Sequence, residues 1–367
     1  EKTIFYTILC ILIVSATVLL WQINKSFLIE IPTTGGSLTE GVIGAPRFIN
    51  PLLAISDADR DLTVLTFSGL LKAKTDGTLT TDIAKDYSIS KNGLEYTFTI
   101  KKGLTFSDGK KITADDIIFT VKKAQDPVLK SPKQASWDGV LVEKINDYKI
   151  KFTLKKPYSP FLDNTTLGIL PMHLWKNIES DQFSFSQLNV NPVGSGPYKI
   201  TKIKRNSSGV PEYYDFTPFK NYALGKAYIK DLRIIFYSNE KTMVGALKNG
   251  DIESVNAISP SITKTLKDEK YNIISTPLSR VFGIFFNQNN APILADKTVR
   301  EALDMAIDKQ QIISDVLAGY GVPIDGPIPP GSIGYIDASK KNNPNNNGTT
   351  TPTHIELARK ILKRGGW

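Results

Sequence analysis

Residues 94–124, LEYTFTIKKGLTFSDGKKITADDIIFTVKKA, constrain the fold more than any other stretch of the chain. Between Tyr96 and Ile100 apolar residues alternate with polar ones, the two-residue period of a half-buried strand. Asn92-Gly93 precedes this strand and predicts a hairpin with a type I′ turn, so residues 87–90 are the expected partner strand.

A helix is predicted directly after the turn at residues 107–109. Thr113 and Asp116 stand at the spacing of a capping box, in which the carboxylate accepts a hydrogen bond from the first backbone amide. The residues expected on the inward face of this helix are Ile117, Val121 and Ala124. The order strand, turn, strand, capped helix indicates mixed α+β structure.

The string YTFTIKKGLTFSDGKKITADDIIFTV resembles the signature block of the family 5 extracellular solute-binding proteins, the peptide- and nickel-binding receptors of ABC importers. Residues 191–198, residues 221–229 and the string ALKNGDIESV are similar to further blocks of that family. The resemblance implies an α/β fold of the periplasmic-binding-protein kind. Two lobes are expected, type II-like, with an extra subdomain.

Composition is that of a folded protein. The 367 residues are 41% hydrophobic and 22% charged, enough for two or three domains with cores of their own. The net charge of +9 comes from lysines spread along the chain, which favours a solvated basic surface over a nucleic-acid-binding stripe. Cys10 is the single cysteine, so disulfides within the chain and cysteine-based metal sites are excluded.

Residues 3–23 carry no charge and are long enough to cross a bilayer as a helix. Trp21-Gln22-Ile23 follows where a signal peptide would show a small-residue cleavage site, so an uncleaved single-pass signal anchor is predicted, with a cleaved signal peptide as the alternative. Lipid attachment at Cys10 is disfavoured because small residues do not precede it. Residues 24–36 are predicted to be a flexible tether.

Three units of the soluble part follow from these signals. The predicted boundaries are residues 37–56 and 190–276 for the main domain of lobe I, residues 57–189 for its extra α+β subdomain, and residues 277–367 for lobe II. A strand is expected over residues 279–287, which opens lobe II. The resemblance implies further strands beyond residue 367, so lobe II is expected to be incomplete.

The sequence offers no set of residues for catalysis. Asp115-Asp116 lies in the first turn of a predicted helix, where acids serve as caps. His173 lacks a second histidine, cysteine or acidic cluster at ligand spacing, and residues 57–61 lack the glycine and glutamate of a calcium loop. We therefore predict neither enzyme activity nor a metal or other cofactor.

The resemblance places the ligand in a cleft that closes by hinge motion. On this chain the first turn of that cleft is expected at Ala45, Pro46, Arg47 and Phe48. Trp137 is a second candidate, either stacked on ligand or part of the core. Arg280 and Phe282 are candidates from lobe II, with surface and core positions as the alternatives.

The function expected from the resemblance is that of an extracytoplasmic substrate-binding subunit of an ABC importer. It would bind oligopeptides and deliver them to permease subunits, as a monomer attached to the cytoplasmic membrane by its N-terminal helix and without a nucleic-acid partner. A receptor for a nickel chelate, a sugar or another small solute is the alternative within the same class. A membrane-bound hydrolase on the same scaffold is the alternative from a different class.

Overall fold

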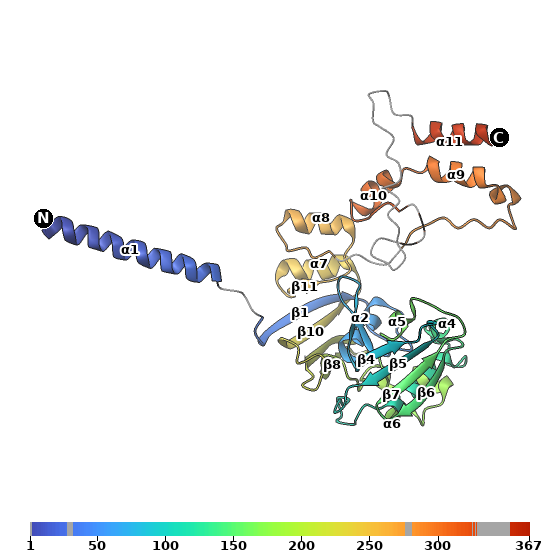
Figure 1. Cartoon of the computed structure of the whole chain (residues 1–367), viewed down its shortest axis with the longest axis horizontal. Coiled ribbons are helices and arrows are strands. Elements are labelled where there is room, and N and C mark those ends of the chain that lie inside the picture. Colours follow the sequence, from blue (N-terminus) through green and yellow to red (C-terminus); the bar gives the residue numbers. More distant parts are fainter. Residues whose placement is uncertain (1, 28–31, 276–280, 325, 327, 329–352) are drawn as a thin grey trace.

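The computed structural model describes residues 2–27, 32–275, 281–324, 326, 328 and 353–367. A long N-terminal helix, α1 (Lys2–Phe27), stands apart from the rest of the chain (Figure 1). Its segment Lys2–Ile23 is long and apolar enough to cross a membrane, a description that a signal sequence fits equally. The helix includes residues 24–27, which the sequence assigned to the tether, because Asn24-Lys25-Ser26-Phe27 contains no glycine or proline to end it.

The main sheet has five strands in the order β11-β1-β10-β9-β8. They are β1 (Gly35–Ile43), β8 (Tyr198–Arg205), β9 (Pro211–Pro218), β10 (Ile229–Tyr237) and β11 (Ser254–Val255). β1 runs parallel to both of its neighbours, whereas β8, β9 and β10 pair in antiparallel fashion. β1 thus comes from the start of the soluble part, whereas its two neighbours, β10 and β11, follow more than 180 residues later.

A second sheet has the order β4-β5-β7-β6 and is antiparallel throughout. It consists of β4 (Ala84–Ile89), β5 (Glu95–Ile100), β6 (Leu141–Asn146) and β7 (Lys149–Thr153), with α3 (Ala114–Gln125) on its buried side. The predicted hairpin is present, but Gly93 has a positive φ (68°) and Asn92 does not. The Gly93 amide donates to the Ser90 carbonyl, so the turn spans residues 90–93 and is not of type I′.

The helix caps follow the sequence prediction closely. The Thr113 amide donates to the Asp116 carboxylate over 2.9 Å at the start of α3, and the three predicted inward residues of that helix are buried. Helix α7 (Glu240–Asn249) ends at Gly250 in the left-handed conformation. Helix α10 (Lys309–Leu317) begins after Asp308, which accepts from the Gln311 amide over 2.9 Å.

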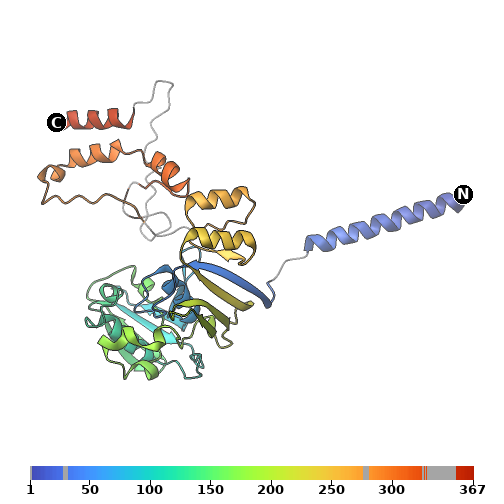
Figure 2. The ribbon, with the colours of Figure 1, turned by 180° about the vertical axis from the view of Figure 1, so that it is seen from behind.

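Short elements connect the two sheets. They are α2 (Asp57–Thr66), β2 (Leu71–Ala73), β3 (Leu79–Thr81), α4 (Gln134–Trp137), α5 (Phe161–Asn164), α6 (Met172–Trp175), and the 3₁₀ turns η1 (Ser180–Phe185) and η2 (Gln187–Asn189). One continuous core runs through the main sheet and the second sheet. A smaller core lies between the main sheet, α7 and α8 (Pro260–Asp268). Figure 2 shows these two helices above the sheet from behind.

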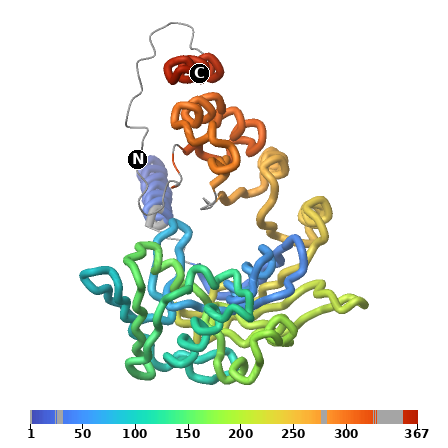
Figure 3. Tube along the Cα trace, turned by 90° about the vertical axis from the view of Figure 1, so that its right-hand side faces the viewer, coloured from blue at the N-terminus to red at the C-terminus, as the bar shows by residue number. Residues whose placement is uncertain are grey.

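The helices from α8 onward lead away from the main sheet (Figure 3), with α10 (Lys309–Leu317) next to α8 and the others farther out. They include η3 (Pro292–Ala295), α9 (Lys297–Ala306) and α11 (His354–Arg364), of which α9 and α11 lie side by side. The strand predicted for residues 279–287 is wrong over its described part, residues 281–287. A strand needs a hydrogen-bonded neighbour, and none of the described residues pairs with this segment.

Candidate ligand-binding site

The loop of residues 44–50 follows the C-terminal end of β1 and contains the four residues predicted for the cleft turn. Its first amide, that of Gly44, donates to the Tyr237 carbonyl at the end of β10 over 2.8 Å. The Asp59 carboxylate then accepts from the amides of Arg47, over 2.7 Å, and of Phe48, over 2.9 Å. The loop is therefore bonded to a neighbouring helix through its main chain and not through its side chains.

Asp59 lies at the N-terminus of α2 and is 2% exposed. Its second carboxylate oxygen accepts from the Ser56 amide over 3.1 Å, and its own amide donates to the Ser56 hydroxyl. A carboxylate is favourable at a helix N-terminus, and a buried one needs several donors to replace water. One side chain thus caps α2 and holds the loop.

Asn50 holds the other end of the loop. Its side chain is fully buried, donates to the Asn189 side-chain oxygen over 3.0 Å and accepts from the Leu52 amide over 2.9 Å. The Ile49 amide also donates to the Asn189 carbonyl over 2.7 Å. Both ends of residues 44–50 are consequently fixed by buried polar groups.

Only Arg47 among the four loop residues is exposed. Pro46 is buried, whereas Ala45 and Phe48 are half-buried. The Arg47 guanidinium lies over the Phe48 ring, 5.3 Å from its centroid. The loop therefore presents a cation beside an aromatic face, which suits a carboxylate or an extended apolar group.

The other predicted site residues lie elsewhere. Trp137 is 2% exposed, and its ring is 5.6 Å from that of Phe152 and 5.7 Å from that of Phe161, so it occupies the core of the second sheet. Phe282 is 76% exposed on the segment that is not a strand. Arg280 lies outside the described residues. Of the described candidates, the structure brings together the four loop residues and places Trp137 and Phe282 elsewhere.

Two partly buried acids, on β1 and on α2, were not predicted. Burial raises the pKa of Glu40 on β1, and the nearby charge of Asp61 on α2 raises it further. Burial also raises the pKa of Asp61, which accepts from the Asn256 side chain over 2.8 Å. The only sequence signal was the acid-rich run at residues 57–61, where Asp59 and Asp61 turn out to face different partners.

The turn at residues 194–197 fixes the far end of α2. A Cβ on Gly194 would lie 1.9 Å from the Thr66 carbonyl oxygen, and one on Gly196 would lie 2.6 Å from the Phe67 amide. The Gly196 amide donates to that Thr66 carbonyl over 2.9 Å. Neither glycine has a positive φ, so close backbone approach, and not turn geometry, requires glycine here.

The acids and histidine considered for chemistry have structural partners. Asp116 also accepts from the Met172 amide over 2.9 Å, and Asp115 pairs with Lys144 over 2.7 Å. His173 lies on α6, with its Nε2 2.6 Å from an Asp108 carboxylate oxygen. Within the described part of the chain, histidine, cysteine and acidic side chains form no group of three or more that is placed to hold a metal ion.

Comparison with known proteins decides the class. Residues 78–367 match the family model "Bacterial extracellular solute-binding proteins, family 5 Middle". The chain belongs to this family. A curated relative in it, the oligopeptide-binding protein AppA of Bacillus subtilis, is 32% identical over 345 residues, which make up 92% of this chain and 60% of the relative. The chain thus spans about three-fifths of the relative's length.

Solved structures of solute-binding proteins share the fold. The ABC transporter substrate-binding protein CtaP of Listeria monocytogenes is 30% identical, with a TM-score of 0.72 over 91% of this chain and 66% of CtaP. NikZ of Campylobacter jejuni, solved with Ni(L-His), is 31% identical, with a TM-score of 0.62 over 79% of this chain and 57% of NikZ. These relatives are binding proteins and not enzymes, in agreement with the class predicted from the sequence.

Proposed function

We propose that the chain is the extracytoplasmic substrate-binding subunit of an ABC importer for oligopeptides, attached to the membrane by α1. The observation that carries the proposal is the loop of residues 44–50, whose main chain is fixed by Asp59 and Asn50 in a chain 32% identical to an oligopeptide-binding protein. The remaining parts of the proposal are permease delivery, membrane attachment and a monomeric state.

Peptide recognition fits the chemistry of this loop. Four amides of the loop are already bonded within the protein, so the loop would meet an extended peptide through its carbonyl oxygens. Such main-chain pairing binds peptides with little regard to their sequence. The Arg47 guanidinium beside the Phe48 ring adds a partner for a carboxylate or an apolar side chain.

Membrane attachment fits the properties of α1. The helix is apolar over Lys2–Ile23, and its described side chains contact solvent and not the soluble part. A cleaved signal peptide is the competing interpretation. Alkaline extraction of membranes from cells making the full chain distinguishes the two: an anchored protein stays in the pellet, and a cleaved one is released with a lower mass.

Native mass spectrometry of the purified full chain tests the ligand class. Co-purifying peptides that exchange unaltered for added peptides support the proposal. Arg47→Ala should weaken the binding of such peptides, whereas Arg60→Ala, an exposed cation on α2 paired with Asp57, should not. Peptides released in cleaved form, or no binding by any peptide in a mixed library, would contradict the proposal.

A nickel chelate is the second candidate, because NikZ, solved with Ni(L-His), is 31% identical to this chain. A chelate carries its own metal ligands, so a receptor for it needs no metal cluster of its own. Isothermal titration with Ni(L-His) set against a peptide mixture separates the two candidates. Saturable binding of the chelate alone would favour this second function.

A further inference from the structure

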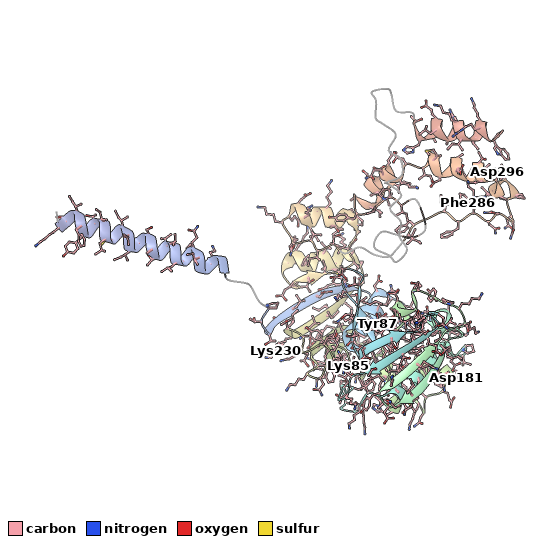
Figure 4. The ribbon with its side chains drawn as sticks, in the orientation of Figure 1. Lys85, Tyr87, Asp181, Lys230, Phe286 and Asp296 are labelled. Carbon is pink, nitrogen blue, oxygen red and sulfur yellow. The ribbon has the colours of Figure 1, made fainter. Side chains whose placement is uncertain are left out.

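The segment of residues 219–230, called the tip below, lies at the end of the main sheet where the chain enters from α1. The Gly35 amide donates to the Tyr228 carbonyl over 2.8 Å, and Gly35 pairs in register with Ile229. Figure 4 shows Lys230 at this end of the sheet, on the side from which α1 approaches. The tip is thus adjacent to the first residue of β1.

The tip is basic and partly apolar. Lys220, Lys226 and Lys230 are exposed, and none of them forms an ion pair with another described residue. Between them Leu224 is 43% exposed and Tyr228 is 55% exposed. Asp231 is the one acid that directly adjoins this segment. Lysine with an exposed tyrosine and leucine is the composition of protein surfaces that rest on an anionic bilayer.

The base of the tip is held by the rest of the protein. The Lys72 ammonium donates to the Tyr222 hydroxyl over 2.9 Å, and the Lys101 ammonium donates to the Ala223 carbonyl over 3.2 Å. Tyr222 itself is buried. Because the base of the tip is fixed, the exposed lysines and the Tyr228 ring are held at defined positions relative to the main sheet.

Chain length keeps the tip close to a membrane that α1 crosses. Helix α1 ends at Phe27 and β1 begins at Gly35, so seven residues separate them. Seven residues span at most about 25 Å when fully extended. The start of β1 at Gly35, to which Tyr228 is bonded, therefore stays within roughly that distance of the C-terminal end of α1.

We propose that the tip rests on the anionic lipid surface of the membrane that α1 crosses, with its lysines on the headgroups and Tyr228 at the interface. This inference rests on the proposed membrane attachment. The tip adjoins one end of β1, and the loop of residues 44–50 follows the other end, about 26 Å away at about 3.3 Å per residue.

Hydrogen exchange of the full chain in lipid nanodiscs tests the proposal. Each lysine near an anionic surface favours association about fivefold. Amides of residues 223–228 should therefore exchange several-fold more slowly in nanodiscs with about one-third phosphatidylglycerol than in pure phosphatidylcholine. Raising the salt concentration to about 1 M, where screening is nearly complete, should remove the difference.

The triple variant Lys220→Ser, Lys226→Ser, Lys230→Ser should lose the slowing in anionic nanodiscs. The matched control replaces three exposed lysines of the extra subdomain by serine, Lys122, Lys133 and Lys176, and should keep it. Both variants change the net charge equally. If the triple variant does not fold, the salt dependence of the unmodified chain still decides the question.

The outcomes separate this inference from the proposed function. Equal exchange in both lipids, from a chain that alkaline extraction leaves in the membrane, overturns the inference and leaves the anchoring intact. Slowing that requires added permease and not anionic lipid also overturns it, in favour of a protein partner. Release of the chain by alkaline extraction overturns the anchoring itself, and peptide binding is measured independently of both.

Discussion

The Asp59 carboxylate lies 2.9 Å from the Phe48 amide, and this contact joins the start of α2 to the loop of residues 44–50. The contact is buried and charged, and the same carboxylate also accepts from Arg47 and Ser56. The N-terminal cap of α2 and the position of the loop therefore depend on the same side chain.

Asp59→Ala should destabilise the protein by roughly 2–4 kcal/mol, because it leaves several buried amides without an acceptor. Peptide affinity should fall as well, since the loop loses its support. Chemical denaturation and titration with peptide measure the two effects. Asp57→Asn, at an exposed position in the same helix turn, should change the free energy of unfolding by no more than about 0.5 kcal/mol. Equal effects from both variants would exclude the role assigned to Asp59.

Gly194→Ala should be strongly destabilising, because the new Cβ would meet the Thr66 carbonyl oxygen at 1.9 Å and that backbone cannot move aside cheaply. We expect a loss of about 3 kcal/mol or more, or failure to fold. Gly245→Ala is the control: nothing lies within 4 Å of its Cβ on helix α7, and the change should stabilise by roughly 0.5–1 kcal/mol. Thermal unfolding of both variants checks the opposite signs.

Stability should decrease as the pH rises from about 4 to about 6. Burial raises the pKa of Asp82 from 3.8 to about 6, while Ser68, Lys72 and Lys101 lower it in part. The folded state therefore binds more protons than the unfolded state in this range, and its stability falls with rising pH until Asp82 is ionised. The expected contribution is roughly 2 kcal/mol.

Asp82→Asn should remove this contribution, because an amide stays neutral across the range. Urea denaturation at pH 4, 5, 6 and 7 measures it for both proteins. If the two proteins show parallel profiles, another group is responsible for the pH dependence.

Trp137→Ala should cost roughly 3–5 kcal/mol of stability, since the indole fills the space between Phe152 and Phe161. Trp137→Phe, which keeps an aromatic ring there, should cost less and leave peptide affinity unchanged. A large loss of affinity in a folded Trp137→Phe protein would restore the ligand-stacking role that the sequence allowed.

The local features of the fold could be predicted from the sequence, because their signals lie within a few residues. The capping box at Thr113, the glycine end of α7 and the alternation in β5 are of this kind. The turn type at Asn92-Gly93 was missed because the dipeptide also suits a turn that starts one residue earlier.

The candidate site was predicted only in part, because its support is tertiary. The sequence pointed to residues 45–48, but gave no sign that Asp59 bonds to them from a different element. Likewise, the glycines at 194 and 196 suggested a turn, and their contact with Thr66 from a segment more than 120 residues away was not visible. Trp137 was compatible with two roles until its neighbours were known.

Because both ends of residues 44–50 are bonded to buried polar groups, this wall of the candidate site should keep its position when a ligand binds. Any conformational change that a ligand requires must then come from the opposing wall. A rigid wall would recognise a feature that many ligands share, such as the spacing of their backbone amides, and not the side chains that distinguish one ligand from another. Broad ligand specificity would then follow from the rigidity of a seven-residue loop and not from its flexibility.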